Sequence, residues 1–188
     1  FAYELCARQI DLADCAHLDL SCWTGAFNGA EPVRASTVER FISRFAPYGF
    51  PRAGHRPVYG LAEATLLVSA EGPGEPPVIR HFSAPDIRGD SRRGSSARVS
   101  CGRPWLGTRV VIVDPESKQI CRPGREGEIW VGGQSVCAGY WEKPAESEAT
   151  FRCKTADGDG PFLRTGDLGF LEGGGLFITG RLKDLIII

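Results

Sequence analysis

The spacing of apolar residues changes part-way along this chain of 188 residues. After the capping-box sequence Ser36 to Glu39, apolar residues recur at helical spacing up to Phe45, which predicts an amphipathic helix. From about residue 101 they alternate instead, and the β-prone runs 108–113 and 126–131 are separated by turns that contain Pro and Gly. The fold class expected is therefore an α/β layered part followed by a small antiparallel β-barrel-like part.

The composition excludes several classes of protein. A hydrophobic fraction of 42% indicates a globular chain, and a net charge of -1 gives no indication of a nucleic-acid partner. No apolar run approaches the roughly 20 residues of a transmembrane helix, and no signal-peptide pattern is present. Seven cysteines without a C-x-x-C pair and three separated histidines show no zinc spacing. Reduced thiols in a cytoplasmic protein are therefore favoured over a disulfide framework.

The stretch from Val58 to Thr65 carries an aromatic residue and a carboxylate close together. Tyr59 is predicted at the end of a strand, Gly60 would allow a tight turn, and Glu63 then opens an apolar segment. Open α/β sheets bind ligands at the carboxyl ends of their strands, where Tyr59 suits an adenine ring and Glu63 a Mg²⁺ bound to phosphate. An ordinary strand-turn-helix, with Tyr59 in the core and Glu63 solvated, fits the same residues.

The loop Asn28 to Pro32 is the second candidate binding segment. It follows a predicted helix over residues 1–10 and a β-prone run over 21–27. Gly29 and the small residue beside it would let a flat ligand approach the backbone closely. An ordinary strand-to-helix turn also favours Gly and Pro, so the loop alone does not indicate a ligand.

Two stretches near the end of the chain combine charged residues with glycine. Asp167 is predicted just past a strand, where its carboxylate could accept hydrogen bonds from two neighbouring ribose hydroxyls. A common β-turn is the alternative. Arg181 could bind a ribose or phosphate oxygen, whereas Lys183 and Asp184 also fit a simple charged turn.

Residues 71–98 are rich in Gly, Pro and Arg, which predicts a long surface loop with at most one short strand, near 78–82. Its arginines could meet phosphates, although a solvated loop explains them equally directly. They are Arg88, Arg92, Arg93 and Arg98.

Three motifs follow one another along the chain: Tyr59-Gly60-Leu61-Ala62-Glu63, Arg164-Thr165-Gly166-Asp167 and Gly180-Arg181-Leu182-Lys183-Asp184. In this order they resemble the motifs of the adenylate-forming superfamily, which contains acyl-CoA synthetases, adenylation domains of peptide synthetases and luciferases. The resemblance covers nearly the whole chain.

Within that superfamily, Phe1 to Cys6, Asn28 to Pro32 and Ala62 resemble the fatty acyl-AMP ligases. Acyl-CoA synthetases usually have Thr at the position of Ala62. The phosphate contact that this hydroxyl gives is therefore not carried over.

The resemblance implies a role for each matching residue. Tyr59, with Gly60 beside it, would stack on the adenine, and the backbone of Gly29, Ala30 and Glu31 would line the edge of the ring.

The remaining assignments concern the sugar, the phosphates and the hinge. Asp167 would bind the ribose hydroxyls and Arg181 a ribose or phosphate oxygen. Glu63 would hold Mg²⁺ on the phosphates of ATP. Lys183 would lie at the hinge about which a C-terminal domain rotates between half-reactions.

The resemblance also implies the organisation of the chain. Residues 1–74 would be part of an α/β nucleotide-binding unit, 75–98 a loop or insertion, 99–180 a β-rich unit and 181–188 the hinge. The chain contains no Met and would be an internal fragment of a large N-terminal domain. A phosphate-binding loop is expected before residue 1 and a domain with a catalytic Lys after residue 188, so the fragment alone is not expected to form an adenylate.

The implied reaction activates a fatty acid with ATP to an acyl-adenylate and pyrophosphate, for transfer to an acyl carrier protein or polyketide synthase in lipid or polyketide biosynthesis. The insertion at 75–98 would disfavour coenzyme A as acceptor. A long-chain acyl-CoA synthetase and a non-catalytic nucleotide-binding fragment are the alternatives.

Overall fold

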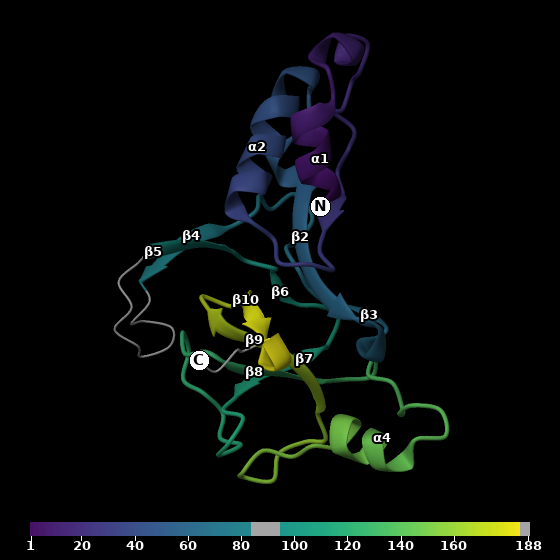
Figure 1. Cartoon of the computed structure of the whole chain (residues 1–188), viewed down its shortest axis with the longest axis vertical. Coiled ribbons are helices and arrows are strands. Elements are labelled where there is room, and N and C mark those ends of the chain that lie inside the picture. The colour runs from purple at the N-terminus through teal and green to yellow at the C-terminus, as the bar shows by residue number, and fades with distance from the viewer. Residues whose placement is uncertain (84–94, 185–188) are drawn as a thin grey trace.

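The computed structural model describes residues 1–83 and 95–184 of the chain (Figure 1). The α-helices in this part are α1 (Ala2–Gln9), α2 (Ala35–Phe45) and α4 (Pro144–Phe151). The strands are β1 (Ala26–Asn28), β2 (His55–Leu61), β3 (Leu66–Ala70), β4 (Ile79–Ser83), β5 (Ser95–Val99), β6 (Arg103–Pro104), β7 (Arg109–Val113), β8 (Gly127–Gly132), β9 (Leu163–Glu172) and β10 (Gly175–Arg181).

The helices α1 and α2 pack side by side at one end of the molecule (Figure 1). The predicted apolar stripe of α2 is buried, and it joins residues of α1 and β1 in one apolar cluster. The predicted helix over 1–10 is thus confirmed. The β-prone run over 21–27 contributes only the short strand Ala26–Asn28.

The start of α2 differs from the prediction, because the capping box does not form. Arg34 is the N-cap residue and no side chain caps the helix. The side chain of Glu39 instead accepts a hydrogen bond from Arg52 at 2.8 Å. Thr37 donates to Glu4 of α1 at 2.6 Å. A partner distant in sequence therefore holds the Glu39 side chain that the capping box would have used.

The strand β2 runs from the helices toward the β-rich end of the molecule (Figure 1). It lies inside a four-stranded sheet of order β1-β2-β3-β6. β1 pairs with β2 in parallel, and β3 pairs with it antiparallel. The carboxyl end of β2 is thereby placed beside the second sheet.

Gly60 lies within β2, not in a turn, so that prediction is wrong. A Cβ atom at this position would lie 1.6 Å from the carbonyl oxygen of Leu66, and the pairing with β3 shifts register between Tyr59 and Gly60. Glycine is needed here because two backbones approach closely. The turn itself is a short 3-10 turn, Ala62–Ala64, followed by Thr65 in the left-handed conformation. β3 follows it, so no helix begins at Glu63.

The second sheet is antiparallel, with the order β10-β9-β8-β7, as the alternating pattern predicts. β7 and β8 lie where the sequence places them, and β9 and β10 form the expected hairpin through Gly173 and Gly174. Both glycines have positive φ, which suits a tight hairpin turn.

The segment expected to be a surface loop contains more regular structure than predicted. β4 confirms a strand near 78–82, but it pairs antiparallel with a second strand, β5, that the sequence does not suggest. Their register places Ile79 opposite Val99 and Ser83 opposite Ser95. Arg98 lies in β5. Residues 84–94 of the predicted loop and residues 185–188 of the predicted hinge lie outside the described residues.

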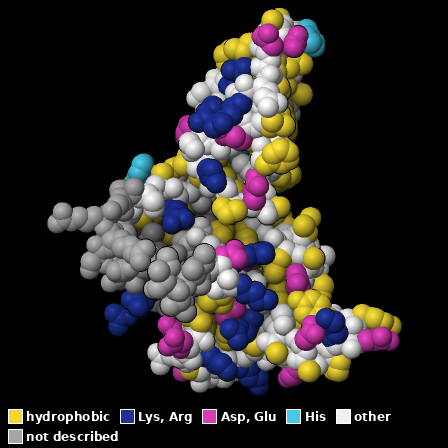
Figure 2. All heavy atoms as spheres, in the orientation of Figure 1, with side chains coloured by type: hydrophobic (Ala, Val, Ile, Leu, Met, Phe, Trp, Pro, Cys, Tyr) yellow, Lys and Arg dark blue, Asp and Glu magenta, His cyan; other side chains and the backbone are white. Residues whose placement is uncertain are grey.

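An apolar cluster joins the two sheets into one body. Tyr59 and Val68 of the first sheet pack in it with Ile129, Leu163 and Leu176 of the second. Charged side chains of both signs lie mixed over the visible face at both ends of the molecule (Figure 2). Of the helices described, none has the length and apolarity needed to cross a membrane.

Candidate functional site

Three side chains predicted from separate motifs meet where the two sheets join. The hydroxyl of Tyr59 donates a hydrogen bond to Asp167 Oδ2 at 2.8 Å. The Nε of Arg181 donates to Asp167 Oδ1, also at 2.8 Å. Asp167 and Arg181 are directly opposite each other on β9 and β10. Tyr59 and Arg181 therefore each donate to one oxygen of the Asp167 carboxylate.

Burial distinguishes the three members. Asp167 is 6% exposed and Tyr59 8%, whereas the Arg181 side chain is 69% exposed. Burial, followed by the nearby charge of Asp167, raises the pKa of the Tyr59 hydroxyl. The same carboxylate raises the pKa of Arg181. Tyr59 therefore stays a hydrogen-bond donor to a charged, nearly buried acceptor, and Arg181 extends from it into solvent.

Asp167 lies inside β9, so its predicted place just past a strand is wrong. The preceding Gly166 has a φ of 72°, and the pairing of β8 with β9 is irregular beside it. Thr165 spans the irregular part, because its hydroxyl donates to the carbonyl of Ile129 at 2.7 Å and accepts from the Asp167 N–H at 3.0 Å. A local distortion of the strand thus directs the Asp167 side chain.

Glu63 lies on the 3-10 turn between β2 and β3 and is half-buried. The hydroxyl of Tyr140 donates to its Oε1 at 2.9 Å. The backbone N–H of Cys137 donates to its carbonyl at 2.8 Å. Burial, with the hydrogen bond to Glu63 next, raises the pKa of Tyr140. The segment after β8 therefore fixes both the backbone and the side chain of Glu63.

The loop containing Gly29, Ala30 and Glu31 lies against β2 next to the site. A Cβ atom on Gly29 would lie 2.8 Å from the carbonyl oxygen of Val58, so only glycine allows this approach. Ala30 has a φ of 65°, and Glu31 pairs with the amino group of Phe1. In the described part of the chain, no hydrogen bond joins this loop to Asp167.

Lys183 is exposed on the 3-10 turn Leu182–Asp184. Within residues 1–83 and 95–184 it makes no hydrogen bond or ion pair. It directly follows the strand that carries Arg181, but it is not drawn into the cluster around Asp167.

A cavity of about 590 Å³ lies away from this cluster, among α1, α2 and the loop between β1 and α2. Asn28 and Glu31 line it, but Tyr59, Asp167 and Arg181 do not. Its polar side chains largely pair with one another, as Glu4 does with Arg8 and Arg40. The chemistry therefore points to the Asp167 cluster and not to this cavity.

Sequence reasoning missed two residues that support the site, Tyr140 and Glu128. Tyr140 lies in an irregular segment and has no periodic signal. Glu128 has one, because it is a carboxylate within the otherwise apolar run of β8, and a charge there requires a partner.

Comparison with known proteins is consistent with this geometry. The family described as AMP-binding enzyme matches residues 2–141. The medium-chain-fatty-acid (acyl-carrier-protein) ligase JamA of Moorena producens is 48% identical, over 100% of this chain and 33% of its own length. The long-chain-fatty-acid AMP ligase FadD26 of Mycobacterium marinum is 40% identical, over 100% of this chain and 34% of its own.

Solved structures show the same fold. A fatty acyl-adenylate ligase from L. pneumophila, in complex with acyl adenylate and pyrophosphate, matches with a TM-score of 0.89 and 43% identity, over 98% of this chain and 33% of that one. The adenylation domain of a keto acid-selecting NRPS module, bound to keto acyl adenylate, matches with a TM-score of 0.81 and 26% identity, over 98% and 34%.

This chain spans about a third of the length of these relatives. The family match, the identities and the shared fold agree with the motifs predicted from the sequence. The chain belongs to the AMP-binding enzyme family of the adenylate-forming superfamily.

Proposed function

We propose that this chain is part of a fatty acyl-AMP ligase, which uses ATP to convert a fatty acid to an acyl-adenylate and pyrophosphate. The observation that carries the proposal is that Tyr59 and Arg181 both donate hydrogen bonds to the Asp167 carboxylate. The names of the related ligases support the choice of a fatty acid.

In this proposal the cluster around Asp167 binds the nucleoside. Each oxygen of Asp167 accepts one hydrogen bond in the structure, and a carboxylate oxygen has a second acceptor site for a ribose hydroxyl. Tyr59 contacts the adenine together with Gly60 and the backbone of the loop 29–31. Because Tyr59 is nearly buried, the base reaches only a small part of its ring.

Glu63 fits a Mg²⁺ ion held through a single carboxylate. The described residues contain no group of three or more His, Cys, Asp or Glu that could hold a metal by themselves. Mg²⁺ commonly uses one or two carboxylates and takes its other ligands from water and substrate phosphates. A bound Mg²⁺ would neutralise charge on the phosphates of ATP.

In the proposed reaction a carboxylate oxygen of the fatty acid bonds to the α-phosphorus of ATP as the bond to pyrophosphate breaks. Negative charge grows on the phosphate oxygens, and positioned cations stabilise it. Among the described contacts of Arg181, only Nε is engaged, so its terminal nitrogens are available to a ribose or phosphate oxygen. Lys183 serves as the hinge next to this arginine.

The acceptor proposed is the phosphopantetheine thiol of an acyl carrier protein, in lipid or polyketide biosynthesis. Support comes from Ala62 and from the ligase whose name includes an acyl carrier protein. Residues 75–98 are proposed to disfavour coenzyme A. A cytoplasmic location is also proposed, supported by seven cysteines that are all free.

The test is pyrophosphate release by the full-length protein over a series of fatty acids of increasing length. Release should depend on the fatty acid, and Glu63→Ala should abolish it. Glu116→Ala, which removes an exposed carboxylate in the turn after β7, should retain it. Equal release by the Glu63→Ala variant and the wild type would contradict the metal assignment, and no release with any fatty acid would contradict the proposed activity.

A second assay distinguishes the proposal from an acyl-CoA synthetase. We expect the thioester to form on a phosphopantetheinylated carrier protein and not on coenzyme A, and a deletion within 75–98 to raise acyl-CoA formation. Efficient acylation of coenzyme A by the intact protein would favour the synthetase instead. A non-catalytic nucleotide-binding protein would form neither product.

A further inference from the structure

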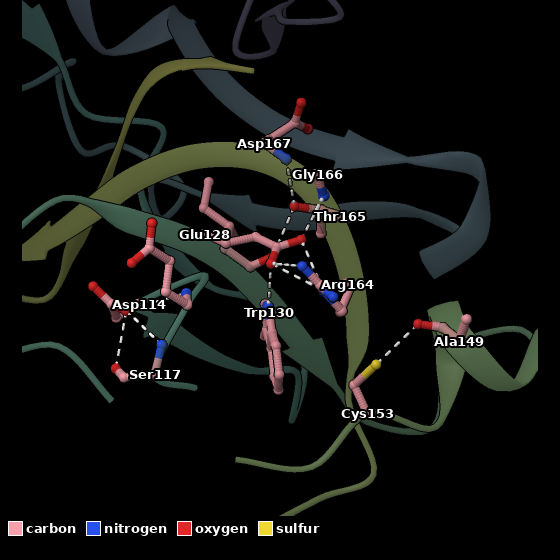
Figure 3. A network of polar contacts seen from close by, with 12 residues as sticks. Asp114, Ser117, Glu128, Trp130, Ala149, Cys153, Arg164, Thr165, Gly166 and Asp167 are labelled. Atoms are coloured by element: carbon pink, nitrogen blue, oxygen red, sulfur yellow. Dashed lines mark hydrogen bonds and ion pairs between the residues drawn. The ribbon is translucent and has the colours of Figure 1, made fainter. Parts of the chain in front are cut away.

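Glu128 is a buried carboxylate that the proposed reaction does not use. It lies on β8, whose residues are all buried, and is itself 1% exposed. A buried charge is costly unless it is paired and hydrogen-bonded. Glu128 is both, since Trp130, Arg164 and Gly166 all donate hydrogen bonds to it (Figure 3).

Both carboxylate oxygens of Glu128 accept hydrogen bonds from more than one donor. Oε2 accepts from the Trp130 indole N–H at 2.8 Å and from Arg164 Nε and a terminal nitrogen at 3.0 and 2.8 Å. Oε1 accepts from Arg164 Nε at 3.2 Å and from the Gly166 backbone N–H at 3.2 Å. The hydrogen bonds to Glu128 are also the largest cause that raises the pKa of Arg164.

These contacts lie where the regular pairing of β8 with β9 is interrupted. The pairing of β8 with β9 shifts between Glu128 and Trp130, and Gly166 has a positive φ. The residues just before Asp167 are therefore held by side chains: Thr165 binds the carbonyl of Ile129, and Glu128 binds the N–H of Gly166. In Figure 3 the Glu128 side chain points into the bend that ends at Asp167.

We propose that Glu128 is a positioning residue, which fixes the 164–166 backbone so that the Asp167 carboxylate is directed at the sugar of the bound nucleotide. This inference rests on the proposed function, in which Asp167 accepts hydrogen bonds from the ribose hydroxyls. Glu128 touches neither the nucleotide nor the reacting atoms in this arrangement. It acts through Arg164 and Gly166.

The test is the preference of the full-length protein for ATP over 2′-deoxyATP and 3′-deoxyATP, expressed as a ratio of kcat/KM values for pyrophosphate release. Asp167→Ala calibrates the assay, because it should reduce the ratio. Glu128→Gln keeps the size of the side chain but turns an amide donor toward Arg164 or Gly166 N–H. We expect it to reduce the ratio on the order of tenfold, which corresponds to about 1.4 kcal/mol, the size of one hydrogen bond.

Two further variants separate positioning from stability. Phe162→Leu alters the buried aromatic ring beside Trp130 without touching Glu128, so it should lower the melting temperature and leave the ratio unchanged. In the Asp167→Ala background, Glu128→Gln should reduce the ratio no further. Trp130→Phe removes one hydrogen bond to Glu128 and should cause a smaller reduction, which keeps the test available if Glu128→Gln does not fold.

The outcomes distinguish the inference from the function beneath it. If Glu128→Gln kept the wild-type preference for ATP while Asp167→Ala lost it, the inference would be overturned and the proposed function would stand. An unchanged ratio in Asp167→Ala would remove the ribose contact and the inference together. Equal losses in Phe162→Leu and Glu128→Gln would also overturn it, because the effect would then be one of stability.

Discussion

Asp167 shows how one side chain can serve both the fold and a ligand. Its carboxylate is nearly buried and accepts from a neutral donor, Tyr59, and a charged donor, Arg181. The buried hydroxyl holds the orientation of the carboxylate, while the exposed guanidinium offers its remaining donors to solvent. Removal of the Tyr59 hydroxyl and removal of the Arg181 guanidinium should therefore have different effects.

Tyr59→Phe should destabilise the protein, because it leaves a nearly buried carboxylate oxygen without its donor. A hydrogen bond to a charged group contributes about 1.5–3 kcal/mol, so the free energy of unfolding should fall by about that much. The Michaelis constant for ATP should also rise. The matched control is Tyr48→Phe. It removes a hydroxyl that donates to the carbonyl of Leu12 at an exposed site. Equal losses in the two variants would contradict the special role of the Tyr59 hydroxyl.

His55 gives the protein a predictable dependence on pH. Burial lowers the pKa of this side chain from 6.5 to about 4. Between these values the unfolded chain binds a proton that the folded chain does not, so stability is lost as the pH falls from 6.5 toward 4. The difference of pKa corresponds to roughly 3 kcal/mol.

The measurement is the free energy of unfolding in denaturant at several pH values between 4 and 7.5. His55→Gln should lose part of the pH slope. His81→Gln, on the exposed face of β4, retains His55 and should keep the whole slope. An undiminished slope in His55→Gln would contradict the prediction.

At the scale of elements, the site depends on segments that connect the two sheets. Residues 135–140 follow β8 and reach the 3-10 turn after β2, where Thr65 donates to the carbonyl of Ser135 and Tyr140 donates to Glu63. α4 supports Tyr140 in turn, since Phe151 packs edge-on against its ring at 5.0 Å and Ser147 accepts from its backbone N–H at 2.8 Å. A helix outside the candidate site therefore sets the direction of the candidate metal ligand.

Tyr140→Phe should raise the Mg²⁺ concentration needed for half-maximal pyrophosphate release by a few-fold. The ring can still pack on Phe151, so the fold is retained, but Glu63 loses the donor that orients it. Loss of one hydrogen bond of about 1 kcal/mol corresponds to roughly a fivefold change. A titration with Mg²⁺ at saturating ATP and fatty acid measures it, and Tyr48→Phe again serves as the control. An unchanged requirement would exclude this role for Tyr140.

At the scale of the whole molecule, one apolar cluster binds the α/β part to the β-rich part. Ile129 of β8 is fully buried in it, together with Tyr59 and Val68. Because the same cluster packs against both sheets, packing fixes their relative position. The candidate site at their junction is therefore held in a fixed geometry.

Ile129→Ala should therefore destabilise both sheets together, by about 2–5 kcal/mol. Trp141→Ala is the contrast, because this large side chain is 88% exposed and its loss should change stability by only about 0.5 kcal/mol. Hydrogen exchange of the amides of β2 and β9 should accelerate in parallel in Ile129→Ala. Acceleration in β9 alone would show that the two sheets do not share one core.

Elements with local signals could be predicted from the sequence. The stripe of α2, the strands β7 and β8 and the Gly-rich hairpin of β9 and β10 all depend on near neighbours and turn residues. The motif resemblance also identified Tyr59, Asp167 and Arg181. Contacts across long separations could not be predicted, such as Tyr59 with Asp167, 108 positions apart, and Tyr140 with Glu63, 77 apart. The error at Gly60 has the same origin, because the backbone that excludes a side chain there arrives from β3.

Trp130 is fully buried, with its indole nitrogen on the Glu128 carboxylate, whereas Trp141 is almost wholly in solvent. Trp23 and Trp105 are both partly exposed, so Trp130 is the one fully buried member of the four tryptophans. The short-wavelength edge of the protein's emission should report on the packing beside Asp167, without any label. Added iodide should quench the short-wavelength emission of Trp130 little while Trp130 remains buried against Glu128.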